Sequence, residues 1–212
     1  MEQETAILIA DLSGYTALTE THGAFSAADL VDKYLEITNA SLVGDSRLHQ
    51  AIGDEVFIVS SAPDYLLSTA IMLLHNAVNQ PNFLQVHGAL HYGKVLVRNG
   101  NYFGEAINLT SRMASHAKAN TFLCSEEFLS LLSNEHLSKM QSKGKFSFKN
   151  VSEEKEVFEL LVEKPDYFRI DPICRMIVHL EIDSISHPVE PDLFFCSHQC
   201  LKLYQDKNSK NS

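Results

Sequence analysis

Apolar residues in the first part of the chain gather in short runs that predict strands. Ile7 to Ile9 forms a β-branched-rich run, and Ser13-Gly14 ends it. Val56 to Val59 forms a second run after Gly53-Asp54, one of the strongest short hairpin signals, and a further strand precedes that turn and ends at Ile52. The pattern therefore predicts a strand ending near residue 12 and a tight hairpin around residue 53.

Other segments carry apolar residues at helical spacing. Ser26 is expected to cap a helix whose apolar face continues to Leu42. Pro63-Asp64 opens a second helix, which ends at Gln80-Pro81, and a third covers about Glu105 to Ala117. Together with the strands, this order predicts an α+β fold with helices on one face of an antiparallel sheet.

Five further segments complete the expected sheet, and the first two of them are expected to join around Gly93. His87 and His91 share one face of the first segment, but no third metal ligand accompanies them, so a structural role is favoured. The five segments are Leu84 to Tyr92, Lys94 to Arg98, Thr121 to Ser125, Lys145 to Lys149 and Glu156 to Val162.

Composition narrows the classes of partner. The 212 residues are 45% hydrophobic, which suffices for one good core and a small appendage. The net charge of −10 argues against a nucleic-acid partner, because phosphate backbones are held by clustered Lys and Arg. No apolar run approaches the roughly 20 residues of a membrane helix, and the acidic start lacks the basic flank of a signal peptide. We expect a cytoplasmic protein with no membrane partner.

Two aspartates stand where predicted strands end. Asp11 follows the first apolar run, and Asp54 lies in the hairpin turn. Two carboxylates that converge from separate strands are what a two-metal phosphoryl-transfer site needs. The alternative for Asp11 is that it only caps a turn.

Asn108 and Arg112 are four residues apart in the third predicted helix, which places them on one face. The planar guanidinium of Arg suits phosphate oxygens, and Asn can orient a ribose or a water, so the pair could stabilise charge that develops on a polyphosphate. The alternative is a solvated helix face.

Three segments together resemble the catalytic domain of class III nucleotidyl cyclases, over about residues 3–163. They are AILIADLSGYT at 6–16, AIGDEVF at 51–57 and YFGEAINLTSRM at 102–113. The resemblance implies a ferredoxin-like fold and a homodimer that binds a nucleoside triphosphate with two Mg²⁺ or Mn²⁺ ions per site. It implies that Asp11 and Asp54 hold the metals and that Asn108 and Arg112 act on the transition state.

The resemblance also assigns substrate-binding positions. Gly14, Tyr15 and Thr16 belong to its first segment. Gln50 and Asn101 stand where adenylyl cyclases of this class have Lys and Asp, and where guanylyl cyclases have Glu and Cys. Because each amide offers donors and an acceptor, it can satisfy either purine edge. ATP is the favoured substrate, and GTP use stays open.

The last forty or so residues differ in character. Cys174, Cys196 and Cys200 are three of the four cysteines, and clustered thiols in a reducing compartment favour metal binding or redox sensing. The segments DPIC and FCSHQC resemble a YHS domain, which usually has glycine where Arg175 stands. A tetrahedral Zn²⁺ site would need a fourth ligand, for which the candidates are His179, His187 and His198. The alternative is a small packing module with buried thiols.

These observations divide the chain into a cyclase-like domain (1–163), a linker (164–168), a YHS-like module (169–206) and a polar tail (207–212). The expected activity is conversion of ATP to a 3′,5′-cyclic nucleotide and pyrophosphate by two-metal catalysis at a homodimer interface. The alternative is a non-catalytic regulatory module that binds a nucleotide or a protein and senses metal or redox state through its cysteines.

Overall fold

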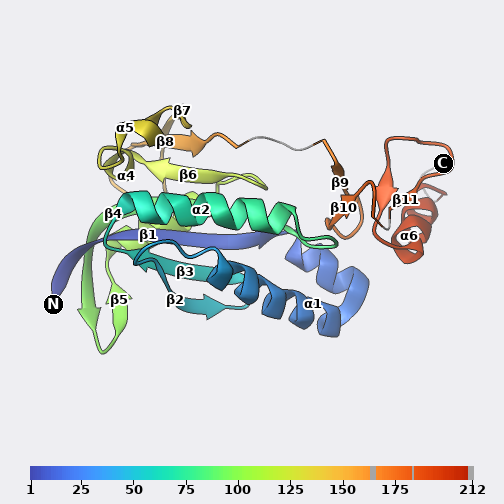
Figure 1. Ribbon diagram of the computed structural model, residues 1–212, viewed down its shortest axis with the longest axis horizontal. Helices are drawn as coiled ribbons and strands as arrows, with labels where there is room; N and C mark the ends of the chain where they lie inside the picture. Colours follow the sequence, from blue (N-terminus) through green and yellow to red (C-terminus); the bar gives the residue numbers. More distant parts are fainter. Residues whose placement is uncertain (163–165, 183, 210–212) are drawn as a thin grey trace.

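The computed structural model describes residues 1–162, 166–182 and 184–209, and it contains one large sheet with a smaller C-terminal module at one end (Figure 1). The sheet follows the order β2-β3-β1-β4-β6-β8-β7, with β5 paired to β4. Its neighbouring strands are antiparallel except β4 and β6, which are parallel. The expected α+β fold is confirmed. The strands are β1 (Glu2–Ser13), β2 (Arg47–Ile52), β3 (Glu55–Ser60), β4 (Gln85–Arg98), β5 (Asn101–Phe103), β6 (Phe122–Ser125), β7 (Met140–Phe146) and β8 (Lys155–Leu160).

Helices cover both faces of the sheet, so the expectation of helices on one face is wrong. Even-numbered residues of β1, such as Leu8, pack in a core with Tyr34 of α1 and Leu66 of α2. Odd-numbered residues, such as Ile9, pack in a second core with Met113 of α3. Side chains alternate between the two faces of a sheet along a strand. Because β1 has apolar residues at both even and odd positions, each face must be covered by packed helices. The helices are α1 (Tyr15–Ala40), α2 (Pro63–Val78), α3 (Glu105–Ala114), α4 (Glu126–Leu129), α5 (Asn134–Leu137) and α6 (His198–Ser209).

The predicted hairpin is confirmed. β2 ends at Ile52, β3 begins at Glu55, and Gly53 adopts a φ of 59° in the two-residue turn between them. This left-handed conformation favours glycine, and it explains why the Gly-Asp pair is a reliable signal.

Helix α1 begins earlier than Ser26, and its expected start is wrong. Gly14, at a φ of 97°, turns the end of β1 directly into the helix, which starts at Tyr15. Gly23 (φ 84°, ψ 171°) kinks the helix, after which the backbone resumes its helical path to Ala40. The apolar pattern is interrupted at this kink, which is why the spacing revealed only the second half.

Strand β4 runs without a break from Gln85 to Arg98, where two strands joined at Gly93 were expected. Gly93 serves packing there. A Cβ at this position would lie 2.8 Å from Nε2 of His91 and 2.9 Å from Cβ of Ala106. Glycine is thus needed for the close approach of α3 to the strand.

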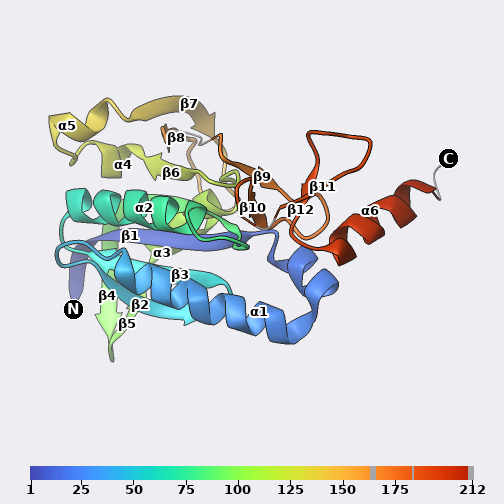
Figure 2. The same cartoon turned by 45° about the vertical axis from the view of Figure 1, so that its right-hand side comes forward.

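The C-terminal module consists of two small hairpins and α6, around a core that contains Cys174, Phe195 and Cys200. Ile177 joins it to the first domain, because its backbone N–H donates to Phe83 O (2.6 Å) and its carbonyl accepts from Asn82 N (3.1 Å). Figure 2 shows the module beside the first turns of α1. Its strands are β9 (Phe168–Ile170), β10 (Ile177–His179), β11 (Ile185–Ser186) and β12 (Phe194–Phe195).

Two expected boundaries need correction. Phe168, placed in the linker, begins β9, and residues 207–209, placed in the polar tail, belong to α6. Residues 164 and 165 of the linker, and 210–212 of the tail, lie outside the described residues. Among the helices that the structure describes, none has the length and apolar character that crossing a bilayer requires.

Candidate functional site

Asp11 and Asp54 lie side by side, as the sequence predicts. Asp11 is near the end of β1, Asp54 is in the β2–β3 turn, and each carboxyl group influences the pKa of the other. Burial raises the pKa of both groups, and the adjacent charge of Asp11 contributes to the pKa of about 6 for Asp54. A turn-capping role alone does not account for Asp11, because its side chain meets a second carboxylate.

The residues around the two aspartates add a further carboxylate and little positive charge. Burial and the charge of Asp54 raise the pKa of Glu55. His87 of β4 lies opposite Asp11 in the β1–β4 pair. Its Nδ1 is 2.9 Å from Ser13 Oγ, and burial lowers the pKa of its imidazole. Apart from His87, no cation among the described residues lowers the pKa of either aspartate. Two adjacent carboxylates that favour a shared proton are a donor set that fits hard divalent cations such as Mg²⁺ or Mn²⁺.

Asn108 and Arg112 lie on one face of α3, and both line a cavity of about 700 Å³. Lys94 and Lys155 line the same cavity, and three glutamates there equal its three cationic side chains in number. Neither Asp11 nor Asp54 is among its lining residues. Asn108 also lines a smaller cavity with Glu55, the residue after Asp54, whereas Arg112 lines only the larger one of these two.

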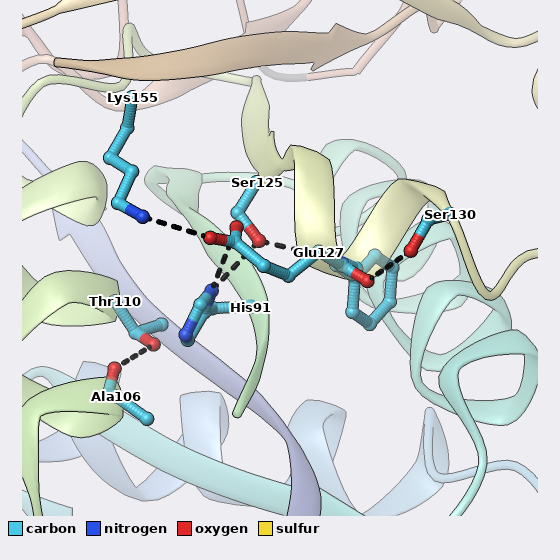
Figure 3. A network of polar contacts seen from close by, with 8 residues as sticks. His91, Ala106, Thr110, Ser125, Glu127, Ser130 and Lys155 are labelled. Carbon is cyan, nitrogen blue, oxygen red and sulfur yellow. Dashed lines mark hydrogen bonds and ion pairs between the residues drawn. The ribbon is translucent and has the colours of Figure 1, made fainter. Parts of the chain in front are cut away.

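A buried polar network forms one wall of this cavity (Figure 3). His91 Nδ1 is 2.7 Å from Ser125 Oγ and 3.8 Å from the Glu127 carboxylate, to which Lys155 Nζ donates at 3.0 Å. Ser125 Oγ also accepts from Phe128 N and caps α4. Burial lowers the pKa of His91 to about 4. Sequence reasoning missed Lys155 and Glu127, since no local motif marks them.

Gln50 and Asn101, the two positions predicted to bind the base, do not line the same cavity. Gln50 is exposed on β2 and lines a cavity of about 230 Å³ with Asn108 and Glu55. Asn101 is not among the residues that line it, and its Nδ2 donates to Asn99 O at 3.5 Å in the β4–β5 turn.

The segment Gly14 to Thr16 forms the N-terminus of α1, where no side chain caps the helix. Free N–H groups at a helix start are suited to phosphate oxygens. Arg175 of the C-terminal module packs closely on this segment. A Cβ added to Gly14 would lie only 2.4 Å from Arg175 Cβ. Arg175 itself adopts a φ of 70°, so this loop keeps the conformation that favours glycine at that position.

Cys174, Cys196 and Cys200 converge, and all are free thiols. The imidazole beside them is His22 of α1, which lies in the first domain. The three histidines expected as a fourth ligand are elsewhere: His179 Nε2 bonds Val78 O (2.9 Å), His187 Nδ1 accepts from Glu190 N (3.0 Å), and His198 is exposed at the start of α6. Spacing within the cysteine-rich segment could not reveal a ligand some 150 residues upstream.

Comparison with known proteins agrees with the resemblance of the first domain. A model of the family described as "Adenylate and Guanylate cyclase catalytic domain" matches residues 1–162. An uncharacterised protein of Mycobacterium tuberculosis is 35% identical over 124 residues, which are 58% of this chain and 33% of that protein. An adenylate cyclase of Glutamicibacter nicotianae is 32% identical over 119 residues, 56% of this chain and 30% of that one. The chain spans about a third of the length of these curated relatives.

Solved structures share the fold at low sequence identity. The adenylyl cyclase CyaB from P. aeruginosa aligns with a TM-score of 0.65 at 18% identity, over 78% of this chain and 97% of that one. The guanylate cyclase domain of RhGC from Catenaria anguillulae, in complex with GTP, gives 0.64 at 16% identity, over 77% and 100%. The family match ends before the cysteine module, and the YHS resemblance stays a prediction.

Proposed function

Because this chain belongs to the family of adenylate and guanylate cyclase catalytic domains, we propose that it converts ATP, and GTP less readily, to a 3′,5′-cyclic nucleotide and pyrophosphate. The observation that carries the proposal is the pairing of Asp11 and Asp54, two half-buried carboxyl groups with raised pKa values that influence each other. A pair of carboxylates without a matching cation is unfavourable unless a proton or a metal compensates the charge.

Asp11 and Asp54 would hold two Mg²⁺ or Mn²⁺ ions through their oxygens. Such ions, when bound, activate the ribose 3′-hydroxyl and neutralise charge on the triphosphate.

The cavity on α3 would supply the guanidinium of Arg112, which lines it together with two lysines and three glutamates. Arg112 and Lys155 both line it, and Asn108 lies between this cavity and the smaller one that contains Gln50. Arg112 would bind the oxygens on which charge develops, and Asn108 would orient the ribose. At the opposite end of the substrate, backbone N–H groups of Gly14 to Thr16 would bind phosphate oxygens.

Base choice would be relaxed. Gln50 presents an amide in the cavity it shares with Asn108, and an amide can rotate to match adenine or guanine. Asn101 would contribute only if it moved away from Asn99 O, the acceptor that it contacts at 3.5 Å. We therefore expect weaker discrimination between ATP and GTP than a charged residue at position 50 would give.

The site would be completed by a second copy of the chain. Asp11 and Asp54 do not line the larger cavity, which contains Arg112, and the resemblance to class III cyclases implies that one chain would supply the carboxylates and its partner the Asn-Arg pair.

The test is production of cyclic nucleotide from ATP and from GTP by the purified chain with Mn²⁺ or Mg²⁺. Asp54→Asn should lower kcat/KM for ATP by at least about 100-fold, because loss of one of two metal carboxylates weakens metal binding severely. Asp29→Asn, at an exposed position of α1, is the matched control and should retain wild-type activity. Full activity of Asp54→Asn would contradict the metal assignment. A chain that binds nucleotide without turnover would instead be a regulatory module.

A further inference from the structure

Four side chains from three separate segments place their ligating atoms together. The imidazole of His22 and the sulfurs of Cys174, Cys196 and Cys200 all lie within 4.8 Å of one another. Cys174 Sγ is 3.4 Å from Cys196 Sγ, which is 3.6 Å from Cys200 Sγ. His22 Nε2 is 3.6 Å from the sulfurs of both Cys196 and Cys200.

Four of the six separations, at 3.4–3.6 Å, are close to the edges of a tetrahedral zinc site. Zn–S bonds of about 2.3 Å and Zn–N bonds of about 2.0–2.1 Å place neighbouring ligand atoms about 3.6–3.8 Å apart. They do not match a disulfide, whose bond is about 2.05 Å. Three thiols and one imidazole also form a closed four-ligand set of the kind used in structural zinc sites.

The ligands are held by a second layer of hydrogen bonds. The buried carboxylate of Asp171 accepts from Cys174 N (3.2 Å) and from Cys196 N (2.8 Å), so one side chain fixes two ligand-bearing segments. Ser197 Oγ accepts from Cys200 N (3.2 Å) at the start of α6. Outer partners of this kind orient metal ligands and are needed for tight binding.

The histidine comes from the other domain. His22 is the residue directly before the Gly23 kink of α1, so the kink ends the first helical segment where its imidazole meets the cysteines. Beside it, Gln199 Nε2 of α6 donates to Thr21 O (2.9 Å), a second contact between the module and the same turn of α1.

We propose that His22, Cys174, Cys196 and Cys200 form a Zn²⁺ site shared between the cyclase domain and the C-terminal module. Zinc there fastens the module to α1, and it keeps Arg175, next to Cys174, against Gly14 at the helix start. This site is independent of the proposed cyclase activity. Its thiolates select a soft metal, whereas Asp11 and Asp54 offer the oxygens that Mg²⁺ prefers.

The full chain, purified under anaerobic conditions, should contain one Zn²⁺ that excess Mg²⁺ does not displace. After metal removal, Co²⁺ should give the visible spectrum of a tetrahedral thiolate site. His22→Ala should weaken Zn²⁺ binding at least about 10-fold in competition with a chelator, since losing a ligand should cost no less than losing an outer partner. His22→Cys should restore tight binding.

His198→Ala is the matched control, because His198 is exposed two residues from Cys196 and should leave Zn²⁺ affinity unchanged. Wild-type affinity in His22→Ala, with an unchanged Co²⁺ spectrum, would overturn the shared site. Absence of bound metal in a fully reduced wild-type chain that also fails to bind added Zn²⁺ would overturn the metal site altogether. If His22→Ala fails to fold, the Co²⁺ spectrum of His22→Cys still tests whether residue 22 is a ligand. A change in that spectrum relative to wild type would show that a fourth thiolate binds the metal, and an unchanged spectrum would contradict the shared site.

Discussion

At the scale of single residues, His91 shows how burial sets a protonation state inside the Arg112 cavity. Its side chain is 5% exposed and contacts Ser125, Glu127 and Gly93. Burial lowers its pKa to about 4, although the Glu127 carboxylate opposes this shift, and Lys155 adds to it. His91 is therefore neutral at physiological pH and adds no charge to the cations that line the cavity.

This protonation state predicts a pH dependence of stability. An unfolded His titrates at about 6.5, so between pH 6.5 and 4 the unfolded chain binds more protons than the folded one, and stability falls as the pH falls. The contribution of His91 is about 3 kcal/mol at most, fully present above pH 6.5. Denaturant unfolding of His91→Gln between pH 4.5 and 7 should show a shallower loss than wild type. His75→Gln, exposed on α2, should follow wild type, and an equal slope in His91→Gln would contradict the prediction.

At the scale of elements, α1 connects three features of the molecule. Its N-terminus carries the predicted phosphate-binding segment Gly14 to Thr16, its first half ends at His22, and its second half packs on the sheet through Tyr34. The kink at Gly23 separates the part that faces the cysteine module from the part that belongs to the core. Arg175 and His22 thus place the module at both ends of the first helical segment.

The contact between Gly14 and Arg175 can be tested by a double-mutant cycle. Gly14→Ala should destabilise the chain more than Gly144→Ala, because both glycines have positive φ (97° and 85°) but only Gly14 leaves no space for a Cβ. Arg175→Gly should recover about 1 kcal/mol or more of the loss in the Gly14→Ala background, because it removes the colliding side chain. Free energies of unfolding in urea give both values. Additive effects would show that the two residues do not interact.

At the scale of the whole molecule, the proposed function places each active site between two chains. The carboxylate pair lies where β1 and the β2–β3 turn meet, and Arg112 lies on α3 in a cavity that neither aspartate lines. Two-fold symmetry would create two equivalent sites, each with contributions from both chains.

Complementation tests this arrangement. Asp54→Ala and Arg112→Ala should each be inactive alone, since every site in either homodimer lacks one group. After subunit exchange in an equal mixture, about half of the dimers are mixed and each has one intact site, so about a quarter of wild-type activity should return. Exchange itself is checked with two affinity tags. An inactive mixture that contains tagged heterodimers would show that one chain supplies the whole site.

The sequence alone determined those features that depend on near neighbours in the chain. The apolar run before Asp11, the Gly-Asp turn at residue 54 and the four-residue spacing of Asn108 and Arg112 are local patterns, and the structure has the corresponding strand, hairpin and helix. The predicted start of α1 and the predicted break in β4 were wrong. In each case a glycine interrupts the apolar pattern without ending the element: Gly23 forms a kink, and Gly93 allows close packing.

Only the tertiary structure decided which distant side chains meet. His22 reaches Cys196 across 174 positions, and Lys155 of β8 reaches Glu127 of α4. No spacing rule relates such pairs, because they come together only when the module packs on α1 and β8 joins the sheet. For the same reason, the sequence revealed three clustered thiols but not the histidine beside them. Local patterns follow from backbone periodicity, whereas these contacts follow from how complete elements pack.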